Sequence, residues 1–242
     1  YTVVVGDEPG TAITTGDENV AVGYNALPAA TTASQNTAVG ASALLSNTSG
    51  QYNSALGREA LKNNTSGAYN TAMGRTALAA NTTASNNTAF GYSALQANTT
   101  GNQNVAVGYN AGAAITTATV NTIIGTSAGD SLTIGNSNIA VGFESLGAEV
   151  AGDRNVAIGN YALTAQSNSS TVDTYNVGVG YNAGAAITTG DLNTAVGALS
   201  LDANTTGANN TAIGYQAMSS VTDGSHNVAV GHNALSALTT HA

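Results

Sequence analysis

A unit of seventeen residues repeats along almost the whole chain, and this period limits the available folds more than any other feature. An asparagine recurs every seventeen residues, except for one interval of twenty-one residues between Asn155 and Asn176. The consensus unit is NTAVGYNALAANTTGAN. Seventeen residues are too few for a helix pair, which needs roughly thirty residues in known helical repeats. The units begin at Thr2, in a divergent first copy, and then at Asn19, Asn36, Asn53, Asn70, Asn87, Asn104, Asn121, Asn138, Asn155, Asn176, Asn193, Asn210 and Asn227.

The pattern inside the unit predicts an all-β fold. One short extended run, Thr/Val-Ala-Val-Gly, is followed by a weaker run around Ala-Leu, and glycine and asparagine separate the two. We expect two short strands and two bends per unit, so that each unit forms one coil of a parallel β-solenoid, or β-roll, of about fourteen coils. Residues 1–242 then form a single repeat domain. The four extra residues fall within 167–174, where we expect a tolerated bulge or a functional loop.

Stacking of the coils turns each position of the unit into a column of similar residues. We number the positions from the recurring asparagine, which is position 1. A column of asparagines can form a ladder of side-chain amides. Position 5 is glycine in every unit, which indicates a backbone with positive φ or a close approach between coils. The residues that we expect to form these structural ladders include Gly23, Gly40, Gly57, Gly74, Gly91, Gly108, Asn36, Asn70 and Asn87.

Alternation along the first strand predicts which side chains are buried. Side chains at positions 2 and 4 point to one face, and those at positions 3 and 5 point to the other. Position 4 carries the larger apolar residues, so we expect it to fill the coil interior. Alanine at position 3 and glycine at position 5 then form a small, apolar outer face that needs a cover. We expect identical chains to provide that cover, three about one axis.

Composition and charge exclude several classes of partner. Only 7% of the residues are charged, the formal net charge is −9, and Lys and Arg together number four. Nucleic acid and anionic lipid surfaces both require clustered basic residues. The chain has no cysteine and no apolar run long enough to cross a membrane. Because it begins and ends within the repeat pattern and has no signal-peptide core, we expect it to be part of a longer protein.

The strand motif resembles that of a known family. The runs NVAVG at 19–23, 104–108 and 227–231 and NVAIG at 155–159 resemble the head repeats of trimeric autotransporter adhesins. The longer form, NTAVGYNAL with NTTG, is similar to repeats of bacteriophage tail fibres. This resemblance implies a left-handed parallel β-roll of three chains, located outside the cell or on a virion. The unit is longer than those of the adhesin heads, and the extra residues should lie in the polar turn.

The predicted function is therefore a structural or adhesive fibre module that attaches to a cell-surface receptor or glycan through many weak sites. Position 6 supplies the candidate ligand surface. Its tyrosines can stack on sugar rings or merely cover apolar surface between coils or chains. Its two arginines, with Glu59 beside them, form either a small basic ligand patch or an exposed, partly paired surface. The candidate residues are Tyr24, Tyr92, Tyr109, Tyr181, Tyr215, Arg58 and Arg75.

No catalytic, cofactor or metal site is predicted, and we expect the chain not to be an enzyme. A polysaccharide-cleaving groove needs paired carboxylates, and no position of the repeat is a carboxylate column. His226, His232 and His241 all lie near the C-terminus, and a metal site would require their side chains to converge. His232 replaces a column usually held by tyrosine and is interpreted as a surface substitution. The alternative function is ice binding, since threonine is abundant. Threonines at positions 13 and 14 are adjacent, however, so they point to opposite faces and do not form a two-column lattice.

Overall fold

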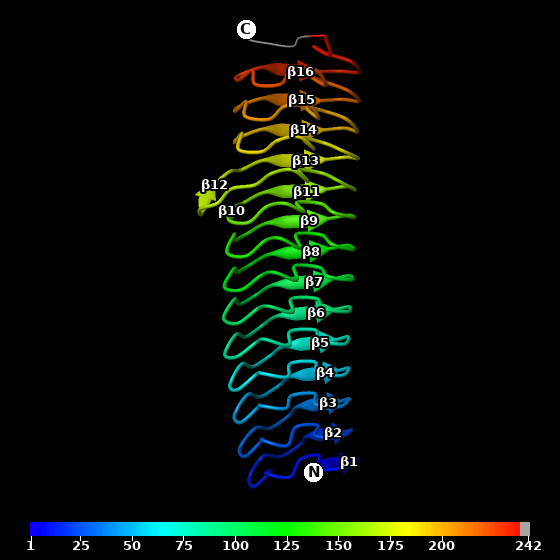
Figure 1. Ribbon diagram of the computed structural model, residues 1–242, viewed down its shortest axis with the longest axis vertical. Helices are drawn as coiled ribbons and strands as arrows, with labels where there is room; N and C mark the ends of the chain where they lie inside the picture. Colours follow the sequence, from blue (N-terminus) through cyan, green and yellow to red (C-terminus); the bar gives the residue numbers. More distant parts are fainter. Residues whose placement is uncertain (238–242) are drawn as a thin grey trace. The chain divides into compact units, whose positions relative to one another are not determined.

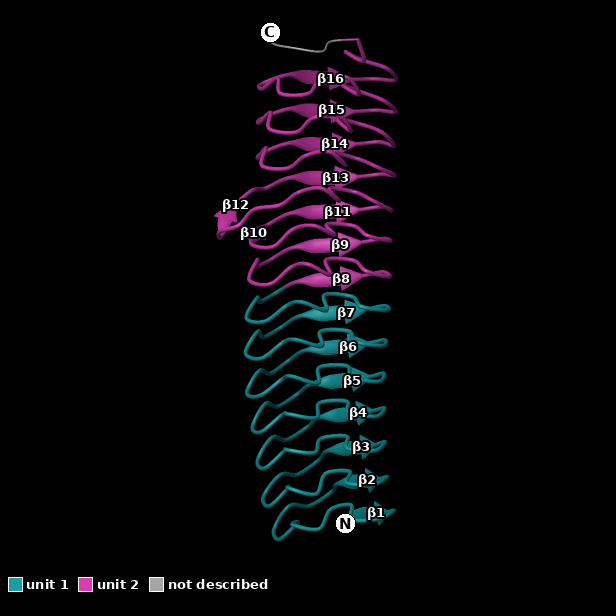
Figure 2. Cartoon of the chain, viewed as in Figure 1, with its two compact units in different colours: residues 1–120 teal, residues 121–242 magenta. Residues whose placement is uncertain are grey.

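The computed structural model describes residues 1–237, which contain strands and turns but no helix. Two compact units, residues 1–120 and 121–242, are coloured separately in Figure 2. Each unit is a parallel β-solenoid with one three-residue strand per turn (Figure 1). In all, the chain makes about 13 turns of about 17 residues, which confirms the predicted fold class. The strands of the first unit are β1 (Val3–Val5), β2 (Val20–Val22), β3 (Thr37–Val39), β4 (Ser54–Leu56), β5 (Thr71–Met73), β6 (Thr88–Phe90) and β7 (Val105–Val107).

The second unit repeats this arrangement and adds one small sheet. Its main strands are paired in parallel with equivalent positions aligned, and the register holds across the interval of twenty-one residues, where Val156 pairs with Val177. The added residues lie in the segment that forms the short strand β12 (Val172–Asp173), which pairs with β10 (Gly152–Asp153) in the polar turn of the preceding unit. The main strands are β8 (Thr122–Ile124), β9 (Ile139–Val141), β11 (Val156–Ile158), β13 (Val177–Val179), β14 (Thr194–Val196), β15 (Thr211–Ile213) and β16 (Val228–Val230).

The glycine at position 5 is required on two grounds. Its φ lies between +126° and +141° in every turn, a region that residues with a side chain rarely adopt. The next turn also lies very close. A Cβ atom placed on Gly91 would lie 2.3 Å from the carbonyl oxygen of Gly108. Glycine therefore allows the turns to approach where each strand ends.

The asparagine at position 1 joins consecutive turns from inside the coil. Asn70 is buried, and its side-chain amide donates to Oδ1 of Asn53 at 3.1 Å and to the carbonyl oxygen of Ala84 at 2.9 Å. Its own Oδ1 accepts a hydrogen bond from the backbone N–H of Asn87 at 3.0 Å. Each amide thus satisfies buried backbone groups that would otherwise lack a partner. A second ladder runs through position 12, where Asn64 Nδ2 donates to Asn47 Oδ1 at 2.9 Å.

The expected second strand around Ala-Leu is absent from the described turns, and that prediction was wrong. Positions 7 and 9 both have positive φ, as in Ser42 (58°) and Leu44 (51°). Two left-handed residues separated by one residue cannot continue an extended strand. The segment is instead a pair of tight turns, in which Ala43 N donates to Gly40 O at 3.2 Å and Asn47 N donates to Leu44 O at 3.2 Å.

The predicted direction of the strand side chains was also wrong. Alanine at position 3 is buried, whereas the larger residues at position 4 are half or more exposed in several turns, as in Leu56 at 50% and Phe90 at 54%. The inward side of the strand faces the backbone at position 8 and the leucine at position 9. A Cβ atom on Gly178, at position 3, would lie 2.9 Å from both Ala183 O and Leu163 Cγ. The coil is so thin that a methyl group fills position 3 in most turns, and the buried Ile123 fits at that position beside Gly129, which has no side chain.

Positions 9 and 12 share one volume of the core. In most turns position 9 is leucine, and asparagine is the commonest residue at position 12 of those turns. Wherever position 9 is glycine, position 12 is isoleucine or leucine, and that residue, or Ile123 in the case of Gly129, fills the space. A Cβ atom on Gly112 would lie 3.0 Å from Ile115 Cδ1. The four pairs of this kind are Gly10–Ile13, Gly112–Ile115, Gly129–Leu132 and Gly184–Ile187.

We predict that Gly112→Leu and Ile115→Asn compensate each other. The first change alone overpacks the core at a cost of about 1–3 kcal/mol, and the second leaves a cavity lined by a buried amide at a cost of about 2–4 kcal/mol. Together they restore the common Leu–Asn pairing, and the new amide gives a donor to Asn98 Oδ1, which has no partner among the described residues. Urea unfolding of both single variants and the double variant measures the coupling, expected at about 2 kcal/mol. Additive losses would contradict it.

We also predict that Gly91→Ala destabilises the chain much more than Gly231→Ala. Both glycines have φ near +130°, so both substitutions incur backbone strain of about 1–3 kcal/mol. Only Gly91 has a backbone oxygen within 2.3 Å of the added Cβ, because nothing lies within 4 Å of that position on Gly231. Denaturant unfolding of the two variants isolates the steric part. Equal losses would show that the close approach of the turns contributes nothing.

Candidate functional surface

The outer surface of the main strands carries most of the exposed apolar side chains. We call the surface made by positions 17, 2, 4 and 6 the sheet face. Among the described residues, all but five of the large apolar side chains that are exposed lie at these positions, the exceptions being Tyr1, Val4, Ile134, Val172 and Leu235. From Asn19 onwards the sheet face has no carboxylate, although the whole chain has thirteen acidic residues. Its exposed members include Tyr24, Tyr52, Leu56, Tyr69, Phe90, Tyr92, Tyr109, Val120, Ile124, Ile139, Phe143, Ile158, Tyr175, Tyr181, Leu192, Ile213 and Tyr215.

The candidate tyrosines at position 6 are all about half exposed, between 42% and 54%. The structure brings only some of them together. The rings of Tyr92 and Tyr109 are stacked with centroids 5.3 Å apart and planes 10° apart, and the guanidinium of Arg75 lies 5.6 Å from the Tyr92 centroid. The ring faces of Tyr92 are therefore used within the column. A sugar cannot enter between the two rings, so a ligand meets mainly their edges and hydroxyl groups.

A second aromatic pair lies along the other edge of the sheet face. Tyr52 and Tyr69 at position 17 are stacked with centroids 4.8 Å apart and planes 4° apart. Tyr52 and Tyr69 were not among the candidate residues predicted from the sequence. Their separation of seventeen residues was the available signal, because side chains one unit apart lie in neighbouring turns.

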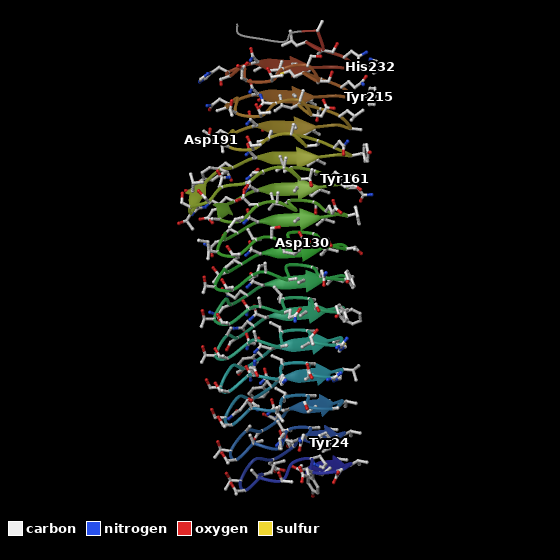
Figure 3. All side chains as sticks on the ribbon, viewed as in Figure 1. Tyr24, Asp130, Tyr161, Asp191, Tyr215 and His232 are labelled. Atoms are coloured by element: carbon white, nitrogen blue, oxygen red, sulfur yellow. The ribbon has the colours of Figure 1, made fainter. Side chains whose placement is uncertain are left out.

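The aromatic contacts of the second unit also lie just after the C-terminal ends of the main strands. Tyr161 contacts Phe143 and Tyr181 edge to face, with centroids 5.3 Å and 6.3 Å apart. His232 stacks on Tyr215 at 5.4 Å. Figure 3 shows Tyr161, Tyr215 and His232 at the arrowhead end of the strands and Asp191 at the opposite edge. His241 lies outside the described residues.

The two candidate arginines have different environments. Arg58 is paired with Glu59 at 3.0 Å, and Lys62 approaches the same carboxylate at 4.0 Å. Within the described chain no carboxylate forms an ion pair with Arg75, whose guanidinium lies over Tyr92 instead. Arg75 is therefore the candidate arginine with hydrogen-bonding capacity left for an anion.

The inserted segment is held by a buried carboxylate. Glu149 occupies position 12, and its Oε1 accepts backbone hydrogen bonds from Val150, Ala151, Gly152 and Asn168 at 2.7–3.1 Å. Its Oε2 accepts another from the Asn168 side chain at 3.0 Å. The contacts satisfy the carboxylate from within the chain, so it serves to attach the insertion to the coil.

Exposed residues on and beside this insertion contact one another. Arg154 forms an ion pair with Asp173 and lies 5.6 Å from the ring of Tyr175. The Tyr175 hydroxyl lies 3.2 Å from the Asp173 carboxylate. These contacts tie β12 to the main stack, and the segment is a firmly anchored projection.

Within residues 1–237 no pocket is present, and no three His, Cys, Asp or Glu side chains lie close enough to hold a metal ion. The described chain also contains no helix that is long and apolar enough to cross a membrane. Comparisons with family models, with curated proteins and with solved structures found no match. The resemblance to adhesin heads and tail fibres therefore rests on the repeat motifs, and the fold shows a parallel β-solenoid.

Partial burial affects two carboxylates at position 10. Burial raises the pKa of Asp130 and of Asp202 above its ordinary value. Hydrogen bonds involving Ser127 and the local backbone oppose the rise at Asp130. Asp202 Oδ1 has no hydrogen-bond partner within the described residues. Because the folded state favours the protonated acid, ionisation of Asp202 reduces the stability of the fold.

We predict that Asp202→Asn stabilises the protein at neutral pH by roughly 0.5 kcal/mol. The raised folded pKa means that the penalty is present above that pKa and disappears as the pH falls below the ordinary value for aspartate. The two proteins should therefore converge in stability near pH 3. Thermal unfolding at both pH values checks this. The exposed Asp223→Asn is the control, and an equal gain there would show that only net charge matters.

Proposed function

We propose that this chain is a structural repeat module of an extracellular fibre, which assembles with identical copies and mediates attachment through many weak contacts. A β-solenoid fits a structural repeat protein, because its surface is a regular array of like residues. The observation that carries the proposal is the sheet face, whose apolar side chains lie in continuous columns along each unit. Apolar patches of more than a few hundred Å² mark interaction surfaces.

The size of the sheet face supports assembly with identical copies. Seven strands at a spacing of about 4.8 Å, with each turn contributing some five extended residues, give on the order of 550 Å² per unit. Each unit by itself thus offers an area close to the roughly 600 Å² per partner at the lower end of specific interfaces. The area is sufficient for association, although area alone does not set affinity.

The interface that we propose differs from the one expected from the sequence. Alanine at position 3 is buried in the coil and glycine at position 5 lies under the next turn, so neither is available to another chain. Positions 2 and 4 replace them as the proposed contact. Three copies and left-handed coils follow from the resemblance to trimeric adhesins, and both stay predictions.

Charge also favours the sheet face as the contact between copies. Two chains that each carry a formal charge of −9 repel each other. The sheet face has no carboxylate from Asn19 onwards, so it is the surface on which two copies meet with the least repulsion.

The first experiment measures the mass of the native particle by light scattering. We expect three times the chain mass of 23.7 kDa. The paired substitutions Leu56→Lys and Phe90→Lys should convert the particle to a folded monomer, because both side chains are exposed within one chain and become buried only on association. Circular dichroism confirms that the variant keeps its fold.

The matched control is Thr83→Lys with Thr100→Lys, which adds the same charge at exposed position 14 of neighbouring turns. These changes should leave the particle mass unchanged. A wild-type monomer, or dissociation by both pairs, would refute assembly through the sheet face.

Ice binding is the competing function, and two observations weaken it. The hydroxyl groups of the position 13 threonines donate to carbonyl groups of the next turn, as Thr82 does to Thr99 at 3.1 Å. On the sheet face, position 4 mixes Val, Leu, Met, Phe and Ile, so it does not offer an even lattice. Thermal hysteresis by the monomer would favour ice binding over the fibre proposal.

A further inference from the structure

The charge of the chain is unevenly distributed along its length. Residues 19–120 contain three basic residues and only one acidic residue, Glu59, which gives a formal charge of +2. Residues 121–242 contain eight acidic residues and only Arg154 as a base, which gives −7. An anionic ligand is therefore repelled by most of the chain and attracted to one stretch of it.

The repeat gathers the positive charge of that stretch along one edge. Arg58 and Arg75 occupy position 6 in neighbouring turns, and Lys62 lies beside the first of them. Glu59 interacts with Arg58 and Lys62 and compensates part of their charge. Arg75 keeps its charge without an ion-pair partner among the described residues.

The aromatic column orients the guanidinium of Arg75. The Arg75 side chain, the Tyr92 ring and the Tyr109 ring follow one another in three turns, at 5.6 Å and 5.3 Å. Stacking on a ring restrains the planar guanidinium while its N–H groups stay free to bind a carboxylate with two parallel hydrogen bonds. The two phenol groups next in the column can each donate and accept a hydrogen bond.

We propose that Arg58, Arg75, Tyr92 and Tyr109 form a binding ledge for a carboxylate-bearing saccharide such as a uronic acid oligomer. The inference rests on the proposed attachment function and names its ligand class. A carboxylate of the saccharide pairs with Arg75, and hydroxyl groups of the adjoining sugar bind the tyrosine phenols. Repetition along the ledge suits a linear polymer, which gains affinity from several weak contacts.

Two other classes of anionic ligand fit the ledge less well. An extended peptide usually binds at a free strand edge or in a groove. The strands that precede Arg58, Arg75 and Tyr92 are paired on both sides, and the described chain has no pocket. Nucleic acid needs more basic residues than the three present here. A ring with hydroxyl groups and one carboxylate matches what the ledge offers.

The test uses calorimetric titration of the full chain with oligogalacturonate and with its methyl ester, which lacks the charge. We expect the acid to bind and the ester to bind at least tenfold more weakly. Arg75→Gln should weaken binding of the acid about tenfold or more, since it removes the charged donor. The matched control is Arg154→Gln, an exposed arginine that already pairs with Asp173, and it should change binding less than twofold.

Several results would overturn the inference. Equal binding of acid and ester would exclude the carboxylate, and equal losses in the two arginine variants would indicate a nonspecific charge effect. Tighter binding of poly-glutamate would indicate an acidic peptide ligand, and no binding at millimolar oligogalacturonate would exclude this class of saccharide. Light scattering on the same samples separates the two proposals. A trimer without saccharide binding refutes only the ligand, whereas a monomer with Arg75-dependent binding refutes only the assembly.

Discussion

The structure depends on the contact between one turn and the next at a fixed offset of seventeen residues. Two inward-facing columns hold this register. Glycine at position 5 brings the backbones together, as the approach of Gly91 to Gly108 shows, and asparagine at position 1 links the turns through its amide. A shift by one residue would place a side chain under a carbonyl group and a buried amide beside an apolar neighbour. The segment that holds the four residues added before Asn176 therefore forms the extra strand β12, because these residues cannot be accommodated in the register.

The sequence was sufficient to predict the solenoid, its period and its ladders, but the face of the strand that we predicted to be buried was the wrong one. The prediction assumed that the larger apolar residues are buried, whereas in this thin coil the larger strand residues are mostly exposed. Variation in size was the better signal. Position 3 is alanine in nearly every unit, as expected for a space that holds one methyl group, whereas position 4 varies from Val22 to Phe90. Positions 1, 3 and 5 also share one direction along the strand, so the buried asparagines and close glycines already indicated that alanine points inward.

Other features could not be read from the sequence because they depend on backbone conformation. Leucine at position 9, as in Leu61 with φ of 50°, adopts a left-handed conformation that its identity does not suggest. Burial of the leucine and the hydrogen bond from Asn64 N to Leu61 O compensate for this strain. The aromatic contacts were partly visible, since residues seventeen apart become neighbours. Whether two rings then stack, as in Tyr52 and Tyr69, or meet edge to face, as in Phe143 and Tyr161, is set by rotamers.

The same thin interior explains why the functional proposals concern the outer surface. A coil that accepts mainly alanine at the inward position of its strand must place most of its larger strand residues outside, so the sheet face is a consequence of the thin core. The proposed association would cover positions 2 and 4 and leave position 6 at the rim, where polar and aromatic groups remain accessible. The proposed assembly and the proposed ligand binding would then use neighbouring columns without competing. Each added turn would extend the proposed interface, whereas the ledge is confined to the turns of Arg58 to Tyr109, and assembly of several chains would multiply the weak contacts on which attachment depends.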